Sequence, residues 1–277
     1  MLSAEIVASV AGQLEAAQVN RQQIQQVSRT YPQMNIDDAY AIQQAWMRHR
    51  IASGRKVRGH KIGLTSRAMQ RSSNIDEPDY GVLLDDMFFD DGSELPADRF
   101  IAPRVEVELA FILGRPLSGP HCSTVDVLDA TRYVMPALEV IDARIEQVDP
   151  ETGRTRTVLD TISDNAANAA VVIGGNPLRP NAIDLRWVSA LCYRNAGIEE
   201  TGVAAGVLNN PAVGVAWLAN RLSARGVTLQ PGDVVLSGSF TRPVQAHPGD
   251  SFHVDYGSLG SVTCRFGILG ESASRER

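Results

Sequence analysis

The sequence predicts an α+β protein in which a mixed β-sheet or roll follows a smaller helical N-terminal region. The first 55 residues are rich in Ala and Gln, and their apolar residues recur at helical spacing. From Lys56 onward, short apolar runs with many β-branched residues alternate with clusters of Gly, Pro, Asp and Asn. Strands and helices do not alternate regularly, which disfavours a doubly wound parallel sheet. We expect a helical region in 1–70 and a β-rich catalytic domain in 71–277.

Two helices carry clear boundary signals. In the N-terminal region, Asn35 can cap the amide of Asp38, and Gly54 is a typical helix stop. Later in the chain, Asn210-Pro211 combines a capping residue with a proline at the first helical position, which predicts an amphipathic helix ending near Leu222.

The β-rich part contains apolar segments bounded by turn residues. We predict strands over 58–63, 101–113, 134–143, 169–173, 185–193, 234–237, 251–254 and 261–266.

Composition narrows the possible functions. The chain has 277 residues, 44% hydrophobic and 21% charged, which is ordinary for a globular protein. A formal net charge of -6 without a basic run argues against a nucleic-acid partner. No segment has the features of a signal peptide or a membrane span, and the three cysteines lie far apart without metal-ligand spacing. We therefore expect a cytoplasmic protein without a disulfide framework or a zinc site.

An acidic pair lies in the segment RVEVELAFIL at 104–113. Strand periodicity sends Val105, Val107 and Leu109 to one face and Glu106 and Glu108 to the other, about 7 Å apart at the backbone. An antiparallel strand with one wet face has the same pattern. The acidic face continues with apolar residues, however, and this favours a partly enclosed site.

A third acid, Glu139, lies inside an apolar run that is typical of a buried strand. An isolated buried carboxylate costs several kcal/mol unless a cation meets it. That cation is either a metal ion or an arginine, with Arg144 and Arg104 as candidates for a buried ion pair. Three carboxylates with positions left for water and substrate suit Mg²⁺ or Mn²⁺, which prefer hard oxygen ligands.

Three further positions have both a functional and an ordinary interpretation. Lys61 lies between glycines at a strand end, where a nearby metal and carboxylates would poise it for proton transfer, or it is an exposed strand lysine. Asp79 lies in a turn-like stretch and is either a turn residue or a proton carrier. Ser163, Asp164 and Asn165 either cap a helix or offer donors to a substrate carboxylate.

Five segments together resemble the hydratase and decarboxylase branch of the fumarylacetoacetate hydrolase superfamily, and the similarity spans essentially the whole chain. They are GHKIGLTS at 59–66, EPDYG at 77–81, VEVELAF at 105–111, ALEVIDAR at 137–144 and SDNAAN at 163–168.

The resemblance implies a mixed β-sheet roll and a metal held by Glu106, Glu108 and Glu139. It also implies that Lys61 and Asp79 assist proton transfers. Substrate contacts are implied for Ser163, Asp164, Asn165, Leu84 and Arg67.

The implied reaction is metal-dependent addition of water to a 2-oxo (enol) dicarboxylic acid in the breakdown of aromatic compounds, carried out by a homo-oligomer acting on a small molecule. Decarboxylation of a related acid and hydration of the shorter 2-hydroxypenta-2,4-dienoate are alternatives. A domain that binds a cation without catalysis is another. A further segment, GSFTRP at 238–243, also resembles this branch. The distal carboxylate of the substrate needs a cationic partner, and Arg67, Arg71 and Arg242 lie in or beside the matched segments.

Overall fold

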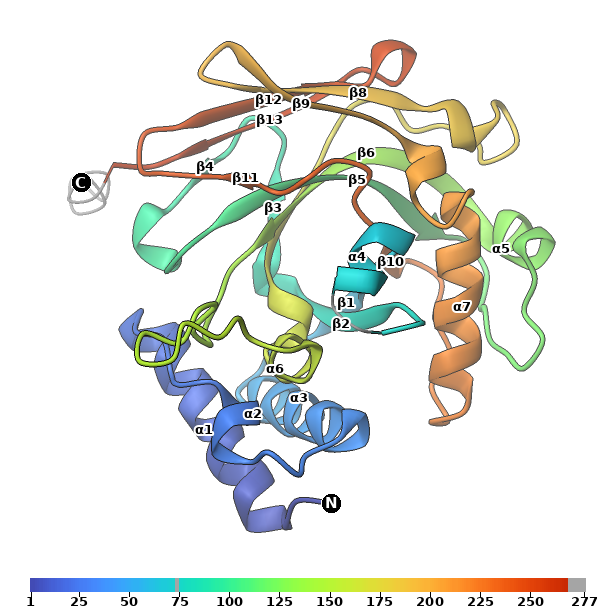
Figure 1. The fold of residues 1–277 in the computed structure, drawn as a ribbon. Coiled ribbons are helices and arrows are strands. Elements are labelled where there is room, and N and C mark those ends of the chain that lie inside the picture. Colours follow the sequence, from blue (N-terminus) through green and yellow to red (C-terminus); the bar gives the residue numbers. More distant parts are fainter. Residues whose placement is uncertain (73–74, 269–277) are drawn as a thin grey trace.

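The computed structural model describes residues 1–72 and 75–268, and its centre is a curled eight-stranded sheet (Figure 1). The strand order is β2-β1-β10-β5-β6-β7-β3, with β11 also paired to β5. The strands are β1 (Val57–Gly63), β2 (Asp79–Leu84), β3 (Phe88–Asp90), β5 (Arg104–Leu113), β6 (Thr131–Ile141), β7 (Asn168–Ile173), β10 (Val234–Leu236) and β11 (Val244–Gln245). Two pairs are parallel and the others antiparallel, so the predicted α+β class with a mixed sheet roll is confirmed.

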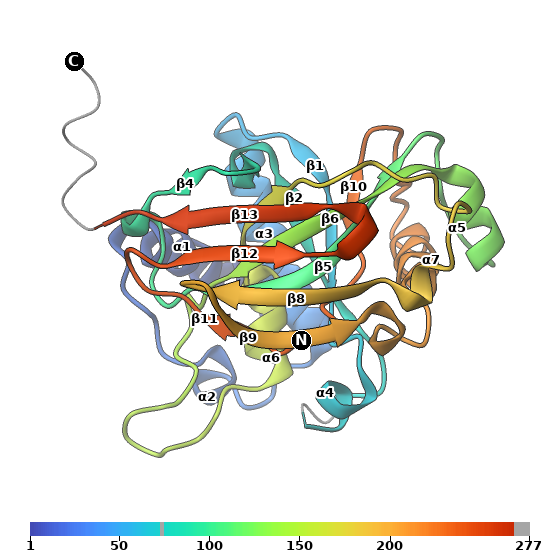
Figure 2. The same cartoon turned by 90° about the horizontal axis from the view of Figure 1, so that it is seen from above.

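A second sheet of five strands, in the order β4-β13-β12-β8-β9, lies over one face of the large sheet (Figure 2). Its strands are β4 (Glu94–Leu95), β8 (Ser189–Arg194), β9 (Gly197–Val203), β12 (Ser251–Asp255) and β13 (Ser261–Phe266). Val105, Val107 and Leu109 of β5 share one buried cluster with Phe252 and Val262 of this second sheet. We call this the outer face of the large sheet, and the opposite, concave side its inner face.

Helices precede and connect the strands. They are α1 (Ala4–Asn20), α2 (Val27–Thr30), α3 (Ile36–Ala52), α4 (Arg67–Ser72), α5 (Thr124–Ala130), α6 (Val158–Ser163) and α7 (Pro211–Ser223). Short 3₁₀ turns are η1 (Asp85–Met87), η2 (Ala97–Arg99), η3 (Asn165–Ala167), η4 (Leu185–Trp187), η5 (Ala204–Gly206) and η6 (Gly257–Leu259). Among the helices of the described residues, none combines the length and apolar character needed to cross a lipid bilayer.

The predicted helix boundaries are confirmed. Asn35 accepts a hydrogen bond from the Asp38 amide at 3.0 Å, and α3 ends two residues before Gly54, whose φ is +103°. Asn210 caps α7 by accepting from the Ala212 amide at 3.0 Å.

The N-terminal helices pack under the open side of the roll. Leu14, Ile42 and Trp46 are buried there, and Gln43 donates to the backbone carbonyls of Tyr80 and Ile162. The boundary at residue 70 stays a prediction. Because β1 pairs with β2 and β10, the helical part of the structure ends with α3.

Two local predictions differ from the structure. The stretch at 77–81 looks turn-like because it holds Pro78 and Gly81, but Asp79 begins strand β2. The strand expected over 185–193 begins only at Ser189. Asp184 instead accepts from the Arg186 amide and starts the 3₁₀ turn η4.

Candidate active site and metal centre

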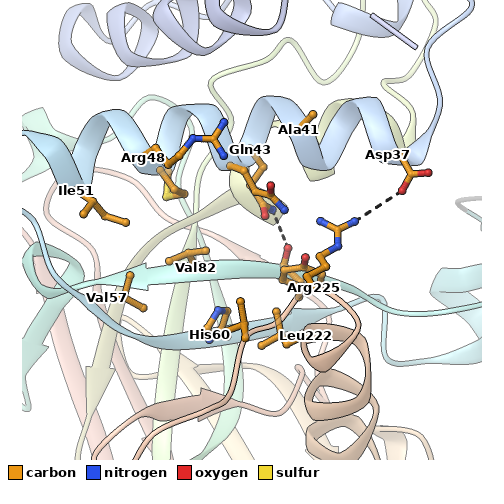
Figure 3. Close-up of a pocket in the computed structure, with 14 residues that line it drawn as sticks. Asp37, Ala41, Gln43, Arg48, Ile51, Val57, His60, Val82, Leu222 and Arg225 are labelled. Atoms are coloured by element: carbon orange, nitrogen blue, oxygen red, sulfur yellow. Dashed lines mark hydrogen bonds and ion pairs between the residues drawn. The ribbon is translucent and has the colours of Figure 1, made fainter. Parts of the chain in front are cut away.

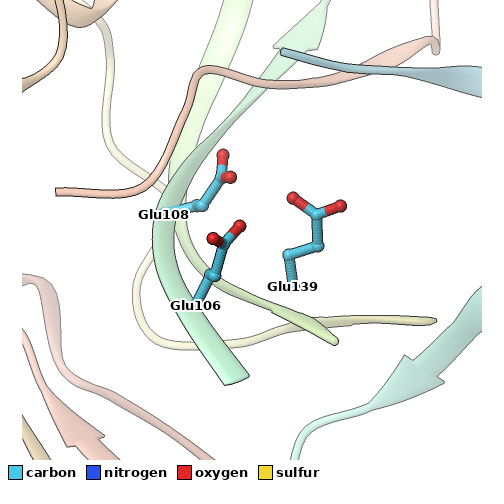
Figure 4. A group of neighbouring side chains, drawn as sticks. All are labelled: Glu106, Glu108 and Glu139. Carbon is cyan, nitrogen blue, oxygen red and sulfur yellow. The ribbon is translucent and has the colours of Figure 1, made fainter. Parts of the chain in front are cut away.

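The three predicted acids meet on the inner face of the large sheet (Figure 4). Glu106 and Glu108 follow each other on one face of β5, and Glu139 lies directly opposite Glu106 on β6. One carboxylate oxygen from each lies within 4.8 Å of the other two. The geometry of the three acids is therefore set by strand alternation and cross-strand register, because all three residues lie on strands.

Lys61 is the cation nearest to Glu139. Its Nζ lies 3.1 Å from Glu139 Oε1 and donates to the Ala166 carbonyl at 3.1 Å. Since β10 and β5 separate β1 from β6 in the sheet, this contact is possible only because the sheet curls. The alternative ion pairs of Glu139 with Arg144 or Arg104 do not form. Arg144 pairs with Asp164 at 2.5 Å, and Arg104 donates to Gln147 Oε1.

Backbone and amide donors orient two of the acids. Asn168 Nδ2 donates to Glu139 Oε1 at 2.9 Å, and the Gly238 amide donates to Glu108 Oε2 at 2.7 Å. Gly238 has φ +117°, and a Cβ there would lie 2.2 Å from Thr65 Oγ1. Only glycine fits this position, so its amide is held against Glu108 by close packing.

The free oxygens of the acids are what a divalent cation needs. Glu108 Oε1 and Glu139 Oε2 are buried and have no hydrogen-bond partner among the described residues. Burial, together with repulsion from Glu139, raises the pKa of Glu106 to about 7 and that of Glu108 well above its ordinary value. A dication bound among these oxygens would remove the repulsion, so the donor set fits Mg²⁺ or Mn²⁺.

Asp79 lies on the inner face of β2, opposite Gly63 of β1. It is 1% exposed, and both its carboxylate oxygens lack a partner among the described residues. A Cβ on Gly63 would lie 2.2 Å from Asp79 Oδ1 and 3.5 Å from Lys61 Nζ. The missing side chain at Gly63 thus leaves the space in which Asp79 and Lys61 face each other.

The charge states of these two groups are set by their neighbours. Burial opposes the charged form of Lys61, but the carboxylates of Glu139, Glu106 and Asp79 outweigh it and raise its pKa. Burial also raises the pKa of Asp79, and Lys61 opposes that shift. Lys61 is therefore a protonated amine, and Asp79 is a carboxyl group with unusually high proton affinity.

The Ser163 to Asn165 segment is fully buried, and its side chains bond within the protein. Ser163 Oγ donates to the Leu159 carbonyl at 2.8 Å, and Asp164 pairs with Arg144. Asn165 accepts from the Val82 amide at 2.8 Å and donates to the Val82 carbonyl at 2.9 Å, as a neighbouring strand would. These side chains hold η3 against the edge of β2, and their substrate contacts stay a prediction.

Backbone strain is concentrated in η3. Asn165, Ala166 and Ala167 have φ values of 53°, 50° and 61°, a conformation that residues other than glycine seldom adopt. The Ala166 carbonyl is thereby directed at Lys61 Nζ. Since the buried bonds of the neighbouring side chains fix this geometry, the loop positions Lys61 beside the acids.

Other predicted substrate contacts lie away from the acids. Leu84 belongs to the main core, on the face of β2 opposite to Asp79, whereas Leu83 belongs to a small inner cluster with Ala110, Ala137 and Leu236. A shift of one residue along a strand moves a side chain to the other face. The geometry therefore favours Leu83 over Leu84 as a residue that faces the acids.

The arginines beside the matched segments are exposed. Arg67 and Arg71 lie on α4, while Arg242 is 85% exposed at its side chain and pairs with Glu200 at 2.8 Å. Their contacts with a substrate stay a prediction.

Sequence reasoning assigned no role to Asn168 or Gly238, although both lie in segments that carry the resemblance. A buried asparagine beginning a strand and a glycine following a strand were the available signals.

A cavity of about 580 Å³ lies on the other side of β1 from the acids (Figure 3). It is lined by residues of α3, β1 and β2 that include Met47, Val57, His60 and Val82. Since Lys61 and His60 point to opposite faces of β1, this cavity does not open onto the acid cluster.

The fold and the site define a protein with a cluster of three carboxylates, able to hold a metal ion, inside a curled mixed sheet. A family model described as fumarylacetoacetate (FAA) hydrolase C-terminal matches residues 50–267. The chain belongs to the fumarylacetoacetate hydrolase family.

Individual relatives narrow the similarity. The chain is 63% identical over 257 residues to the 2-oxo-hept-4-ene-1,7-dioate hydratase of Escherichia coli, covering 93% of this chain and 96% of that protein. It is 40% identical to a 2-keto-4-pentenoate hydratase of Paraburkholderia xenovorans, with 86% of each chain covered. A crystal structure of 4-oxalocrotonate decarboxylase from Pseudomonas putida G7, complexed with magnesium and adipate, superposes with a TM-score of 0.90 at 34% identity, covering 96% of this chain and 99% of that one.

Proposed function

We propose that the chain is a divalent-metal-dependent hydro-lyase that converts 2-oxo-hept-4-ene-1,7-dioate and water into 4-hydroxy-2-oxo-heptanedioate in aromatic catabolism. The observation that carries the proposal is the convergence of three carboxylates, two of them with an unpaired buried oxygen, beside a buried lysine and a buried aspartate. The 63% identity to a hydratase of that substrate supports the same reaction.

Glu106, Glu108 and Glu139 would hold Mg²⁺ or Mn²⁺. When bound, the ion supplies Lewis-acid polarisation of the substrate's C2 oxygen and a template for its C1 carboxylate. The magnesium in the related decarboxylase structure supports this donor set.

Lys61 is the proton donor of the proposed reaction. Isomerisation of the substrate to its 2-oxo-3-ene form moves one proton from C3 to C5 and makes C4 electrophilic. Addition of water at C4 then leaves an enolate that must be protonated at C3. Lys61 is held in its ammonium form by the surrounding carboxylates, and its Nζ lies at the acid cluster. It can therefore deliver that proton.

Asp79 is the proposed general base. Its two oxygens have no partner among the described residues, and burial raises its pKa toward the range useful for proton transfer near neutrality. It would take the proton from the water that attacks C4. Gly63 leaves the space between Asp79 and Lys61 in which both groups can reach the reacting carbons.

The test is to incubate the purified protein and Mg²⁺ with the dienol acid and to follow the products by NMR and mass spectrometry. We expect a hydroxylated product one water heavier than the substrate. Carbon dioxide release without that product would assign the chain to decarboxylation. Absence of turnover, with metal binding retained, would instead favour a cation-binding domain.

The metal preference between Mg²⁺ and Mn²⁺, the homo-oligomeric state and the cytoplasmic location remain predictions from the sequence. Metal titration after EDTA treatment and light scattering address the first two.

A further inference from the structure

The proposed substrate has a second carboxylate at C7, and the site needs a cation that meets it at the correct distance. This inference rests on the proposed function. If C1 and C2 lie at the acid cluster, the five carbon-carbon bonds from C2 to C7 place the distal carboxylate roughly 6 Å away. A carboxylate taken from water at that point is stable only against a fixed positive charge.

Arg104 lies beside the acid pair on strand β5. It precedes Glu106 by two residues, and the register of β5 against β6 has no irregularity between Arg104 and Ile112. Strand alternation therefore places Arg104 on the inner face with Glu106 and Glu108, with its backbone about 7 Å from that of Glu106.

Arg104 makes its side-chain hydrogen bonds to neutral groups. Its Nη2 donates to Gln147 Oε1 at 2.6 Å and its Nε to Gln245 Oε1 at 3.3 Å, and both acceptors are neutral amides. Among residues 1–72 and 75–268, no carboxylate forms an ion pair with it. A half-buried guanidinium whose printed hydrogen bonds go only to neutral amides can turn its fork of donors to a ligand carboxylate.

A second arginine adds to the positive charge of this region. Arg156 is close to Asp164, at 3.5 Å, but Asp164 is already bound to Arg144. Burial, and then repulsion from Arg144 and Arg104, lowers the pKa of Arg156 despite that contact. The positive charge of Arg156 also acts to lower the pKa of Asp79, against the effect of burial. The positive charge of Arg156 therefore acts on both Arg104 and Asp79.

We propose that Arg104 forms the subsite for the distal carboxylate and so gives the site its preference for dicarboxylic over monocarboxylic 2-oxo acids. The exposed arginines Arg67, Arg71 and Arg242 are the competing positions.

Binding of two matched unreactive acids tests the subsite independently of catalysis. The probes are 2-oxoheptanedioate and 2-oxoheptanoate, which differ only in the distal carboxylate, titrated calorimetrically into the full chain with Mg²⁺. We expect the wild type to bind the dioate about 10- to 100-fold more tightly, the range of one charge-assisted contact. Arg104→Gln should abolish that difference without weakening 2-oxoheptanoate, and Arg104→Lys should restore part of it.

Kinetics supply a second readout. Arg104→Gln should raise the KM for hydration of the seven-carbon dioate while leaving kcat and KM for 2-hydroxypenta-2,4-dienoate within about two-fold of wild type. Arg186→Gln, which alters an exposed arginine paired with Asp184, is the matched control.

Three results would overturn the subsite. They are equal weakening of both probes by Arg104→Gln, a loss of Mg²⁺ affinity in that variant, and loss of the probe difference in Arg67→Gln or Arg242→Gln. A wild type that distinguishes the probes through Arg104 but hydrates neither substrate would instead refute the proposed function alone.

Discussion

The two faces of strand β1 carry neighbouring buried bases with opposite behaviour. Lys61 is 3% exposed on the inner face, and His60 is 6% exposed on the outer face. Carboxylates raise the pKa of Lys61 against the effect of burial, whereas burial alone lowers the pKa of His60 to about 4. Similar burial thus has opposite outcomes on the two faces, because carboxylates act strongly on Lys61 while burial is the only effect that shifts the pKa of His60.

Replacing the inner-face cation should have the largest effect. Lys61→Met removes the proposed proton donor and leaves Glu139 without its ion pair, so we expect kcat for hydration to fall about 10²- to 10⁴-fold. Steady-state kinetics at saturating Mg²⁺ measure this. Lys56→Met, at the exposed start of the same segment, is the control. Turnover of Lys61→Met within ten-fold of wild type would remove Lys61 from the mechanism.

Neutralising an inner-face acid should separate metal binding from folding. In Glu108→Gln the amide oxygen can still accept from Gly238, while repulsion among the three acids falls. We expect Mg²⁺ affinity to drop by at least about 100-fold, since even groups behind metal ligands are worth 10- to 100-fold. The melting temperature without metal should not decrease.

Calorimetric metal titration and thermal unfolding with and without Mg²⁺ make this measurement. Glu199→Gln, which alters an exposed glutamate paired with Arg194, is the matched control. Unchanged Mg²⁺ affinity in Glu108→Gln would exclude the three-carboxylate centre.

The inner-face acids were predictable because their positions follow from one strand and its neighbour. Alternation along β5 places Glu106 and Glu108 together, and an acid within an apolar run indicates a buried partner for Glu139. The identity of that partner was not predictable. Lys61 lies 78 residues from Glu139 in the chain, and only the curl of the sheet brings the two together.

The turn predicted at 77–81 was wrong because the glycine there serves a contact between distant segments, and the contact of Lys61 with Glu139 is of the same kind. Gly81 suggests a turn, but a Cβ there would lie 2.4 Å from the Asn165 carbonyl oxygen, so the glycine serves the close approach of η3. Likewise, Asn165 resembles a substrate donor in sequence, while its amide bonds the edge of β2. Both roles depend on how the roll closes, which no short segment encodes.

The inner and outer faces of β2 should also differ in how much stability is lost when a neighbouring side chain is truncated to alanine. Leu83 is fully buried in the inner cluster, so Leu83→Ala should cost about 2–5 kcal/mol. Val82 is half-buried and lines the cavity of about 580 Å³, so Val82→Ala should cost only about 1 kcal/mol. Urea unfolding gives both values. Equal costs would show that the outer cavity is filled in solution.

The smallest effect at neutral pH is expected for His60, whose contribution appears in the pH dependence of the free energy of unfolding. Its ring lies 6.4 Å from that of Tyr80, and the charged groups around the outer cavity are Arg48, Arg225 and Asp37. The unfolded ring has a pKa near 6.5 and the folded ring one of about 4, so the unfolded state binds more protons between these values. The contribution is therefore complete above pH 6.5 and is lost as the pH falls toward 4.

The loss should amount to about 3 kcal/mol over that window, because one pKa unit corresponds to about 1.4 kcal/mol. Urea unfolding of wild type and His60→Gln at a series of pH values isolates the effect, since titrating carboxylates act on both proteins alike. The stability difference between them should narrow or reverse as the pH falls below 6.5. Exposed His49, replaced by Gln, should show no such change. A pH-independent difference would mean that the outer face, like the inner one, supplies a partner for the charged base.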